Sequence, residues 1–347
     1  MRDDDRMLSD PELPFGSGVI GVCDVCGKRQ AVIVLQKERF KLCVIDFLNK
    51  TWSQSKARPG APLPAFRSER VWYPTESTSE GKAPAVVLSP TRVVKHPVVM
   101  ITPDVYGLTT SILDAAVRFA HEGFEVLLPD SGKTSSVGPT DHLALRFGAL
   151  SGRGVTVEAP RVRRLVNLYA DALKYLRGRE MVDPEKSALF GLSYGGSLAV
   201  ALAGKDLRLS AVALAYPLPV QPAEYVGLLT SPVFIAYGQK DGTSAKAVGQ
   251  FRAHRPASAA PLEVAEIAGV RHEFLGRDLR AYNLAGAEDA WRQVIAFLRS
   301  RLMPSPPKPP SPLRPAAAAG VPGAPVPVAA PPRIAPPTSA GPGPTPA

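Results

Sequence analysis

The sequence predicts an α/β domain in which helices cover both faces of a largely parallel sheet. Short apolar runs typical of buried strands recur along the chain, as at residues 98–102, 124–128 and 233–237. Segments with apolar residues at helical spacing lie between several of these runs. A further apolar run passes through a Gly-x-Ser-x-Gly turn directly into an Ala-rich segment. Regular alternation of strands and helices is typical of parallel sheets with buried faces.

The individual elements follow from these patterns. Additional strands are expected at residues 69–73, 85–88 and 262–267, and in the run that begins at Ala188. Helices are expected where apolar residues share one face, at residues 112–120, 162–176 and 288–302, and in the Ala-rich segment 197–203.

Composition divides the 347 residues into five parts. We expect a flexible N-terminus at 1–18, a small Cys-containing module at 19–50, a linker at 51–68, the α/β domain at 69–303 and a Pro/Ala-rich tail at 304–347. The tail holds 17 of the 37 prolines and lacks the apolar residues needed for a core, so we expect it to be disordered.

Charge and hydropathy exclude several classes of protein. The net charge is +10, but the basic residues are scattered and form no run with interleaved aromatics, which argues against nucleic-acid binding. The first residues are charged and precede no apolar run, so no signal peptide is expected. No apolar stretch reaches the length of a membrane span. A cytoplasmic protein is the expectation.

The three cysteines all lie near the N-terminus and form no secreted disulfide framework. Cys23 and Cys26 flank a turn that ends in glycine, and Cys43 and Asp46 repeat the two-residue spacing. Zinc accepts three thiolates and one carboxylate, so these four residues are candidate ligands of a structural zinc ion. Three free thiols or a redox pair are the alternatives.

Ser193 is the candidate nucleophile, because it stands in the Gly-x-Ser-x-Gly turn between a strand and a helix. Gly191 and Gly195 lack a Cβ, so strand and helix can approach closely on either side. The following helix would place the backbone N–H of Tyr194 at its positive end, beside a developing oxyanion.

An acid and a histidine follow in the order typical of this turn. Asp241 comes after the strand at 233–237, and His272 comes after the strand at 262–267. The hypothesis is that His272 takes the proton of Ser193 while Asp241 orients and charge-stabilises the imidazole. A turn aspartate and an ordinary loop histidine are the alternatives for each residue alone.

From about Arg70 to Leu302 the chain resembles the dienelactone hydrolase family, which has the α/β-hydrolase fold. Besides the serine turn, the Gly-x-x-Asp loop and His-x-Phe segment, two passages carry the resemblance: residues 98–108 (VVMITPDVYGL) and 119–130 (FAHEGFEVLLPD). The resemblance implies a hydrolase that needs no organic cofactor. It also implies that the N–H of Val105 forms the second half of an oxyanion hole with Tyr194.

Three departures from the family pattern bear on the substrate. The founding members carry a cysteine at the position of Ser193 and a glutamate at the position of Asp104, which could instead cap a loop. They also carry an arginine four residues after the histidine, where this chain has Gly276 followed by Arg277. A broader ester or thioester substrate is therefore expected rather than a dienelactone.

The sequence thus predicts a serine hydrolase that cleaves a small-molecule ester or thioester through an acyl-enzyme. One alternative is a peptidase of the prolyl-oligopeptidase kind, although no segment before Arg70 is long enough for its gating domain. Another is a non-catalytic adaptor that recruits protein partners through the Cys-containing module or the Pro-rich tail.

Overall fold

The structure is a computed structural model that describes residues 66–91, 94–104, 107–130, 154–205, 208–276 and 279–303. It also describes the backbone of four short strands nearer the N-terminus, β1 (Gly21–Val22), β2 (Gln30–Ala31), β3 (Ile33–Leu35) and β4 (Phe40–Leu42). β1 pairs with β2 and β3 with β4, both antiparallel. The flexible N-terminus, the four candidate zinc ligands, the linker up to residue 65 and the Pro-rich tail lie outside the described residues.

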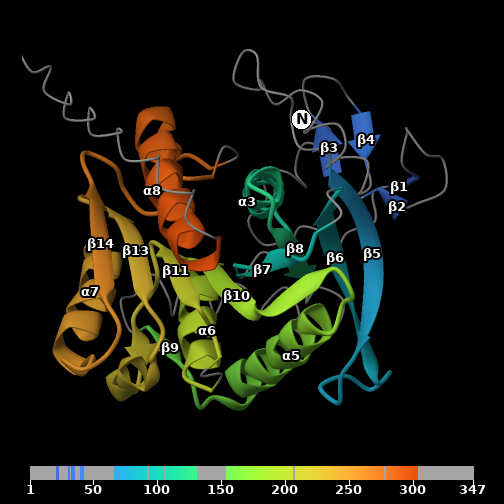
Figure 1. The fold of residues 1–347 in the computed structure, drawn as a ribbon. Helices are drawn as coiled ribbons and strands as arrows, with labels where there is room; N and C mark the ends of the chain where they lie inside the picture. Colours follow the sequence, from blue (N-terminus) through green and yellow to red (C-terminus); the bar gives the residue numbers. More distant parts are fainter. Residues whose placement is uncertain are drawn as a thin grey trace, which may run out of the picture. The chain divides into compact units, whose positions relative to one another are not determined.

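An eight-stranded sheet forms the centre of the domain (Figure 1). Its order is β14-β13-β11-β10-β7-β8-β6-β5. The six strands from β14 to β8 pair in parallel, whereas β6 and β5 add an antiparallel edge. The strands are β5 (Phe66–Pro74), β6 (Lys82–Pro90), β7 (His96–Thr102), β8 (Glu125–Pro129), β10 (Val182–Leu192), β11 (Ala211–Ala215), β13 (Val233–Gly238) and β14 (Leu262–Ile267).

Helices cover both faces of this sheet, as predicted. α3 (Thr110–His121) and α8 (Leu284–Leu302) pack on one face. α5 (Pro160–Arg177), α6 (Tyr194–Ala203) and α7 (Gly242–His254) pack on the other, so that the two layers lie above and below the sheet in Figure 1. The expected α/β-hydrolase architecture is therefore confirmed for the described residues between 66 and 303, and β5 begins three residues before the expected domain start.

Local sequence explains why the helices form where they do. α5 has Pro160 in its first turn and Gly178 at its C-terminal cap, and its apolar stripe from Val162 to Leu176 is buried. The side chain of Asn283 accepts a hydrogen bond from the backbone N–H of Gly286 at 2.8 Å and so caps α8. α6 is buried along its whole length, because its small residues let it pack closely against the sheet.

Two short strands and a 3₁₀ helix, η1 (Ala223–Leu228), complete the domain beside this core. β9 (Val155–Thr156) pairs in parallel with β12 (Val220–Gln221) and connects the start of α5 to the segment after β11. These elements lie on the side of the sheet that carries α5, α6 and α7.

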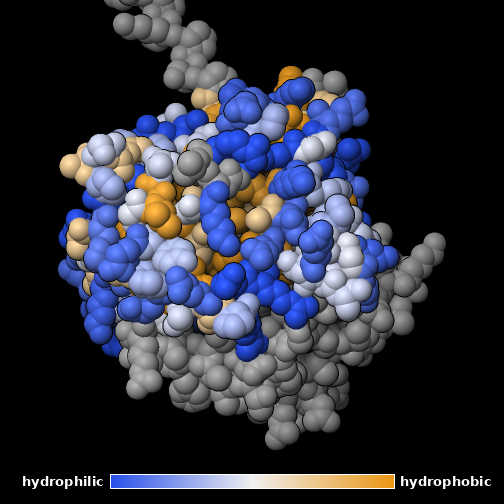
Figure 2. All heavy atoms as spheres, turned by 90° about the horizontal axis from the view of Figure 1, so that it is seen from below, coloured by the Kyte–Doolittle hydropathy of each residue, from blue (hydrophilic) through white to orange (hydrophobic). Residues whose placement is uncertain are grey.

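The described surface is mainly hydrophilic, with hydrophobic residues gathered in the middle of the face seen from below (Figure 2). Among the described residues, the large hydrophobic side chains that remain at least half exposed are Trp72, Val94, Leu228 and Leu284. Within the described ranges, no helix combines the length and hydropathy needed to cross a bilayer.

Candidate active site

The serine turn joins β10 directly to α6, as the sequence predicted. Ser193 adopts φ 50° and ψ −119°, and its backbone N–H donates to the carbonyl of Ala215 at 3.0 Å. A positive φ is costly for a residue with a side chain and persists only where the surroundings enforce it. The turn therefore holds Ser193 in a strained conformation at the carboxyl end of β10.

Close contacts across the turn explain both of its glycines. A Cβ at Gly195 would lie 2.2 Å from the carbonyl oxygen of Thr102, and one at Gly191 would lie 2.6 Å from the carbonyl oxygen of Gly195. Both distances are far below those of real Cβ contacts. The Thr102 hydroxyl also donates to the Gly195 carbonyl at 2.7 Å, which ties the turn to the end of β7.

The structure brings the three predicted side chains together. Ser193 Oγ lies 3.0 Å from His272 Nε2, and His272 Nδ1 lies 2.6 Å from Asp241 Oδ2. Ser193 follows β10, Asp241 follows β13 and His272 follows β14, so all three come from the carboxyl ends of parallel strands. The hydrogen-bond pattern assigns the imidazole proton to Nδ1 and leaves Nε2 free to accept from the serine hydroxyl.

Ser244 is a further member of the site that the sequence analysis did not identify. Its hydroxyl donates to Asp241 Oδ2 at 2.6 Å, and its backbone N–H donates to Asp241 Oδ1 at 3.0 Å. Asp241 thereby acts as the N-cap of α7 while it also contacts His272. The sequence does contain a signal for this contact, because Asp241 stands three residues before Ser244 at the start of a helix, which is the spacing of an N-cap hydrogen bond.

Burial and charge act in opposite directions on the pair formed by Asp241 and His272. Burial alone would raise the pKa of Asp241, but the hydrogen bond and charge of His272, with the two bonds from Ser244, hold that pKa below its usual range. Burial alone would lower the pKa of His272, but the hydrogen bond and charge of Asp241 raise it above its usual value, with smaller contributions from Glu273 and Asp104. The pair therefore strengthens His272 as a base.

Only one of the two predicted oxyanion donors, Tyr194, lies among the described residues. Tyr194 is the first residue of α6 and directly follows Ser193, so its backbone N–H stands at the positive end of the helix. The side chain of Tyr194 is buried, which raises the pKa of its hydroxyl to about 12. Val105 lies outside the described residues, and its role stays a prediction.

Asp104 follows the end of β7 by two residues. It forms a tight turn in which the backbone N–H of Gly107 donates to its carbonyl at 2.9 Å. Its negative charge also raises the pKa of both His272 and Tyr194, so its carboxylate acts on the site electrostatically. The catalytic role of Asp104 stays a prediction.

Aromatic residues support the imidazole from the sheet side. The ring of Tyr216, directly after β11, lies edge-on to the ring of His272 with centroids 5.0 Å apart. Tyr216 also contacts Phe274 in the same geometry at 5.6 Å. Tyr216 has φ 39°, a conformation that propensity alone would not predict.

Metal binding at the cysteines remains a prediction, because all four candidate ligands lie outside the described residues. Among the residues that the structure does describe, no group of three His, Cys, Asp or Glu side chains is arranged to hold a metal ion. Arg277, next to Gly276 after the histidine loop, is likewise not described.

Comparison with known proteins agrees with this architecture. The sequence pattern of the dienelactone hydrolase family matches residues 83–302. A Bradyrhizobium protein named as a probable 2-oxo-3-(5-oxofuran-2-ylidene)propanoate lactonase is 24% identical over 245 residues, which cover 67% of this chain and 94% of the relative.

Two solved structures from metagenomic libraries share the fold. A dienelactone hydrolase-like promiscuous phosphotriesterase superposes with a TM-score of 0.54 at 20% identity, covering 68% of this chain and 99% of its own. The carboxylesterase EstE1 superposes with a TM-score of 0.52 at 17% identity, covering 75% of this chain and 96% of its own. The match to the family pattern spans more than half of the sequence, and the matched range contains Ser193, Asp241 and His272. The chain therefore belongs to the dienelactone hydrolase family.

Proposed function

We propose that the protein is a serine hydrolase that cleaves a small-molecule carboxylic ester, lactone or thioester through an acyl-enzyme. The observation that carries this proposal is the chain of hydrogen bonds from Ser193 Oγ through His272 to Asp241, at 3.0 Å and 2.6 Å. The names of the lactonase and carboxylesterase relatives support a carbonyl ester as the bond that is cleaved.

In the proposed first step, Ser193 Oγ attacks the carbonyl carbon while its proton passes to His272 Nε2. The negative charge that develops on the carbonyl oxygen is stabilised by the backbone N–H groups of Tyr194 and Val105. When the tetrahedral intermediate collapses, the bond to the leaving alcohol or thiol breaks and His272 returns the proton to it. The product of this step is an acyl ester on Ser193.

Water completes the cycle by the same chemistry in reverse order. His272 takes a proton from the water as it attacks the acyl carbon, and it then protonates Ser193 as the acid leaves. Asp241 stays ionised throughout, because its carboxylate accepts hydrogen bonds from His272 and Ser244 and its pKa is held low. Its charge stabilises the imidazolium that forms in each transition state.

Covalent labelling with a fluorophosphonate tests the proposal, with the modified peptide identified by mass spectrometry. We expect one adduct, on Ser193, that is absent from Ser193→Ala. His272→Gln should slow labelling strongly, whereas the matched His254→Gln, at the C-terminal end of α7, should label as the wild type does. Persistent labelling of Ser193→Ala would contradict the assignment, and no labelling of folded protein would favour the adaptor alternative.

Zinc binding by Cys23, Cys26, Cys43 and Asp46 is a separate part of the proposal. It would stabilise the N-terminal module, because a segment of this size buries little apolar surface of its own. Elemental analysis of protein purified without chelator should give one zinc per chain, and Cys43→Ser should lose it. A preparation with no stoichiometric zinc would refute this part without affecting the hydrolase.

A further inference from the structure

All the non-glycine residues with a positive φ in the described part of the chain lie at the active site. They are Ser193 at φ 50°, Tyr216 at 39° and Glu273 at 64°. This left-handed region disfavours residues that have a side chain, and such strain gathers at functional sites. Ser193 stands in the serine turn and Tyr216 carries the ring that contacts His272. Glu273 is strained in the same way, and the reaction described above gives it no role.

Glu273 directly follows His272 and carries a carboxylate without a partner. The residue is half-buried, yet within the described structure its side chain makes no hydrogen bond or ion pair. Neither carboxylate oxygen belongs to the buried polar atoms that lack a partner, so both remain open to solvent. A ligand in the site can therefore feel this charge directly.

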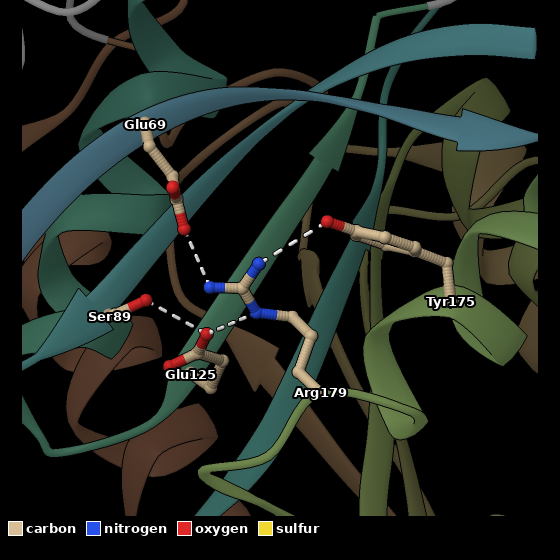
Figure 3. Close-up of polar contacts among 5 residues, drawn as sticks. All are labelled: Glu69, Ser89, Glu125, Tyr175 and Arg179. Atoms are coloured by element: carbon tan, nitrogen blue, oxygen red, sulfur yellow. Dashed lines mark hydrogen bonds and ion pairs between the residues drawn. The ribbon is translucent and has the colours of Figure 1, made fainter.

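The other buried or half-buried carboxylates among the described residues have partners. At the opposite end of the sheet, for example, Figure 3 shows the guanidinium group of Arg179 between Glu69 and Glu125. Its Nη2 donates to Glu69 at 2.6 Å, and its Nε donates to Glu125 at 3.0 Å. An unpaired carboxylate beside the base of the site is an exception in this domain and calls for an explanation.

The leaving group of the proposed reaction lies on the same side of the site as Glu273. His272 Nε2 is 3.0 Å from Ser193 Oγ and passes the serine proton to the leaving atom, so that atom must come within hydrogen-bond reach of the imidazole. The charge of Glu273 already reaches this ring. Burial lowers the pKa of His272, but Asp241 and then Glu273 raise it. A leaving group hydrogen-bonded to the imidazole stands in the same field.

The other described charges around the imidazole do not cancel this field. Asp104 also raises the pKa of His272, so its charge adds to that of Glu273. Arg271 precedes the histidine but is exposed, where water screens its charge. Arg161 acts on the hydroxyl of Tyr194, whose pKa burial raises and Arg161 lowers. Among the described residues, the leaving-group side of the site is therefore negative.

We propose that Glu273 selects esters or thioesters whose alcohol or thiol part carries a cationic group such as an ammonium, and disfavours those whose alcohol or thiol part is anionic. This inference rests on the proposed hydrolase function and assigns its substrate class. The bonds made and broken are those of the proposed reaction, and the cation takes no part in them. Its attraction to Glu273 strengthens binding and speeds acylation.

Three thioesters with the same butanoyl group test this substrate class. The thiol part is cationic in the thioester of thiocholine, neutral in that of 2-mercaptoethanol and anionic in that of 3-mercaptopropanoate. Thiol release gives kcat/KM for each, which reports acylation because the acyl-enzyme is shared. Glu273→Gln keeps the size of the side chain and removes its charge. The ratio of kcat/KM for the cationic to that for the anionic thioester should fall by about fivefold to twentyfold, since an attraction and a repulsion are both lost.

Two comparison variants and a salt series separate this role from a structural one. Glu273→Gly removes the charge and also relieves the backbone, and it should lower the ratio as Glu273→Gln does. Glu185→Gln changes an exposed carboxylate near the start of β10, roughly 25 Å from Ser193, and should leave the ratio unchanged. Raising the salt from about 0.01 M to about 1 M should bring the wild-type ratio toward that of Glu273→Gln.

The outcomes distinguish this inference from the function on which it rests. A ratio that Glu273→Gln leaves unchanged, or that Glu185→Gln lowers equally, would overturn the substrate class while the hydrolase stands. Labelling of Ser193 by a fluorophosphonate without cleavage of any of the three thioesters would do the same. Folded protein that shows neither labelling nor cleavage would overturn the proposed function together with the inference.

Discussion

Replacing Asp241 by asparagine separates the charge of this residue from its shape. Asparagine has nearly the same volume, and its carbonyl oxygen can still accept the backbone N–H of Ser244 that caps α7. What changes is the contact with His272 Nδ1, now 2.6 Å from a carboxylate oxygen. An amide N–H turned toward Nδ1 would favour the tautomer with the proton on Nε2, which cannot accept the proton of Ser193.

Two magnitudes follow from this geometry. In an acid–His–Ser set of this kind, substitution of the acid by its amide lowers the rate by about 10⁴-fold, or about 5.4 kcal/mol of transition-state stabilisation. The pH dependence should change as well. His272 must be neutral to act as a base, so the rate falls as the pH drops through its folded-state pKa, which Asp241 raises above the usual value. Without that carboxylate, burial dominates and the inflection moves to lower pH.

The assay is the second-order rate constant of fluorophosphonate labelling, measured from about pH 5 to about pH 9, the range in which histidine titrates. Asp289→Asn, a partly exposed position on α8, is the matched control and should label as the wild type does. A rate for Asp241→Asn within tenfold of the wild type, or an inflection that moves to higher pH, would refute the reasoning.

Four further substitutions test the residues that support the site and those at the opposite end of the sheet. Ser244→Ala should lower the free energy of unfolding, measured by urea denaturation, by about 1.5–3 kcal/mol. It should slow labelling by less than about tenfold, because the lost hydrogen bond is present both before and during the reaction, and a thousandfold lower labelling rate would contradict this. Gly195→Ala should destabilise the fold by about 3 kcal/mol or more, because the added Cβ would lie 2.2 Å from a backbone oxygen. Gly249→Ala should stabilise α7 by about 0.5–1 kcal/mol, because its added Cβ would have nothing within 4 Å. Equal effects of the two substitutions on stability would be inconsistent with this geometry. Arg179→Ala should cost about 3–5 kcal/mol in the same assay, because it leaves the carboxylate of Glu125 buried and unpaired, and a cost below about 1 kcal/mol would argue against a buried pair.

The parts of the fold that the sequence predicted are those with a strong period or a strong local rule. The stripe of α5 from Val162 to Leu176 and the serine turn at Ser193 are of this kind. The hydrogen-bonded set of Ser193, Asp241 and His272 was also predictable. Each of these residues follows a strand, and their order along the chain can be read without knowing any distance.

β11 and α7 were not predicted, for identifiable physical reasons. β11 reads Ala-Val-Ala-Leu-Ala, and alanine favours helices, but pairing with β10 and β13 on either side overrides that propensity. α7 contains Gly242 and Gly249 and shows no clear apolar stripe. Its strongest start signal, the N-cap Asp241, also fits the acid of the site, so its second role as a cap was missed.

The contacts made by Glu125 could not be predicted either, because they depend on register. Ser89 and Arg179 reach this residue from segments 36 and 54 residues away in the chain. Alternation along β8 gives no sign of a buried charge at its first position. Such a network becomes visible only when the order of the strands is known.

The exchange of cysteine for serine is consistent with the electrostatics of the site. A cysteine thiol has a pKa near 8.5, so a strongly basic histidine beside it would favour a resting thiolate–imidazolium pair. A serine hydroxyl is far less acidic and stays neutral, so its proton can move to the imidazole only as the new bond forms. Serine therefore needs a stronger base than cysteine does. The hydrogen bond and charge of His272, with smaller contributions from Ser244, hold the pKa of Asp241 low. Asp241 in turn raises the pKa of His272 despite its burial, and in the proposed mechanism this supplies the stronger base.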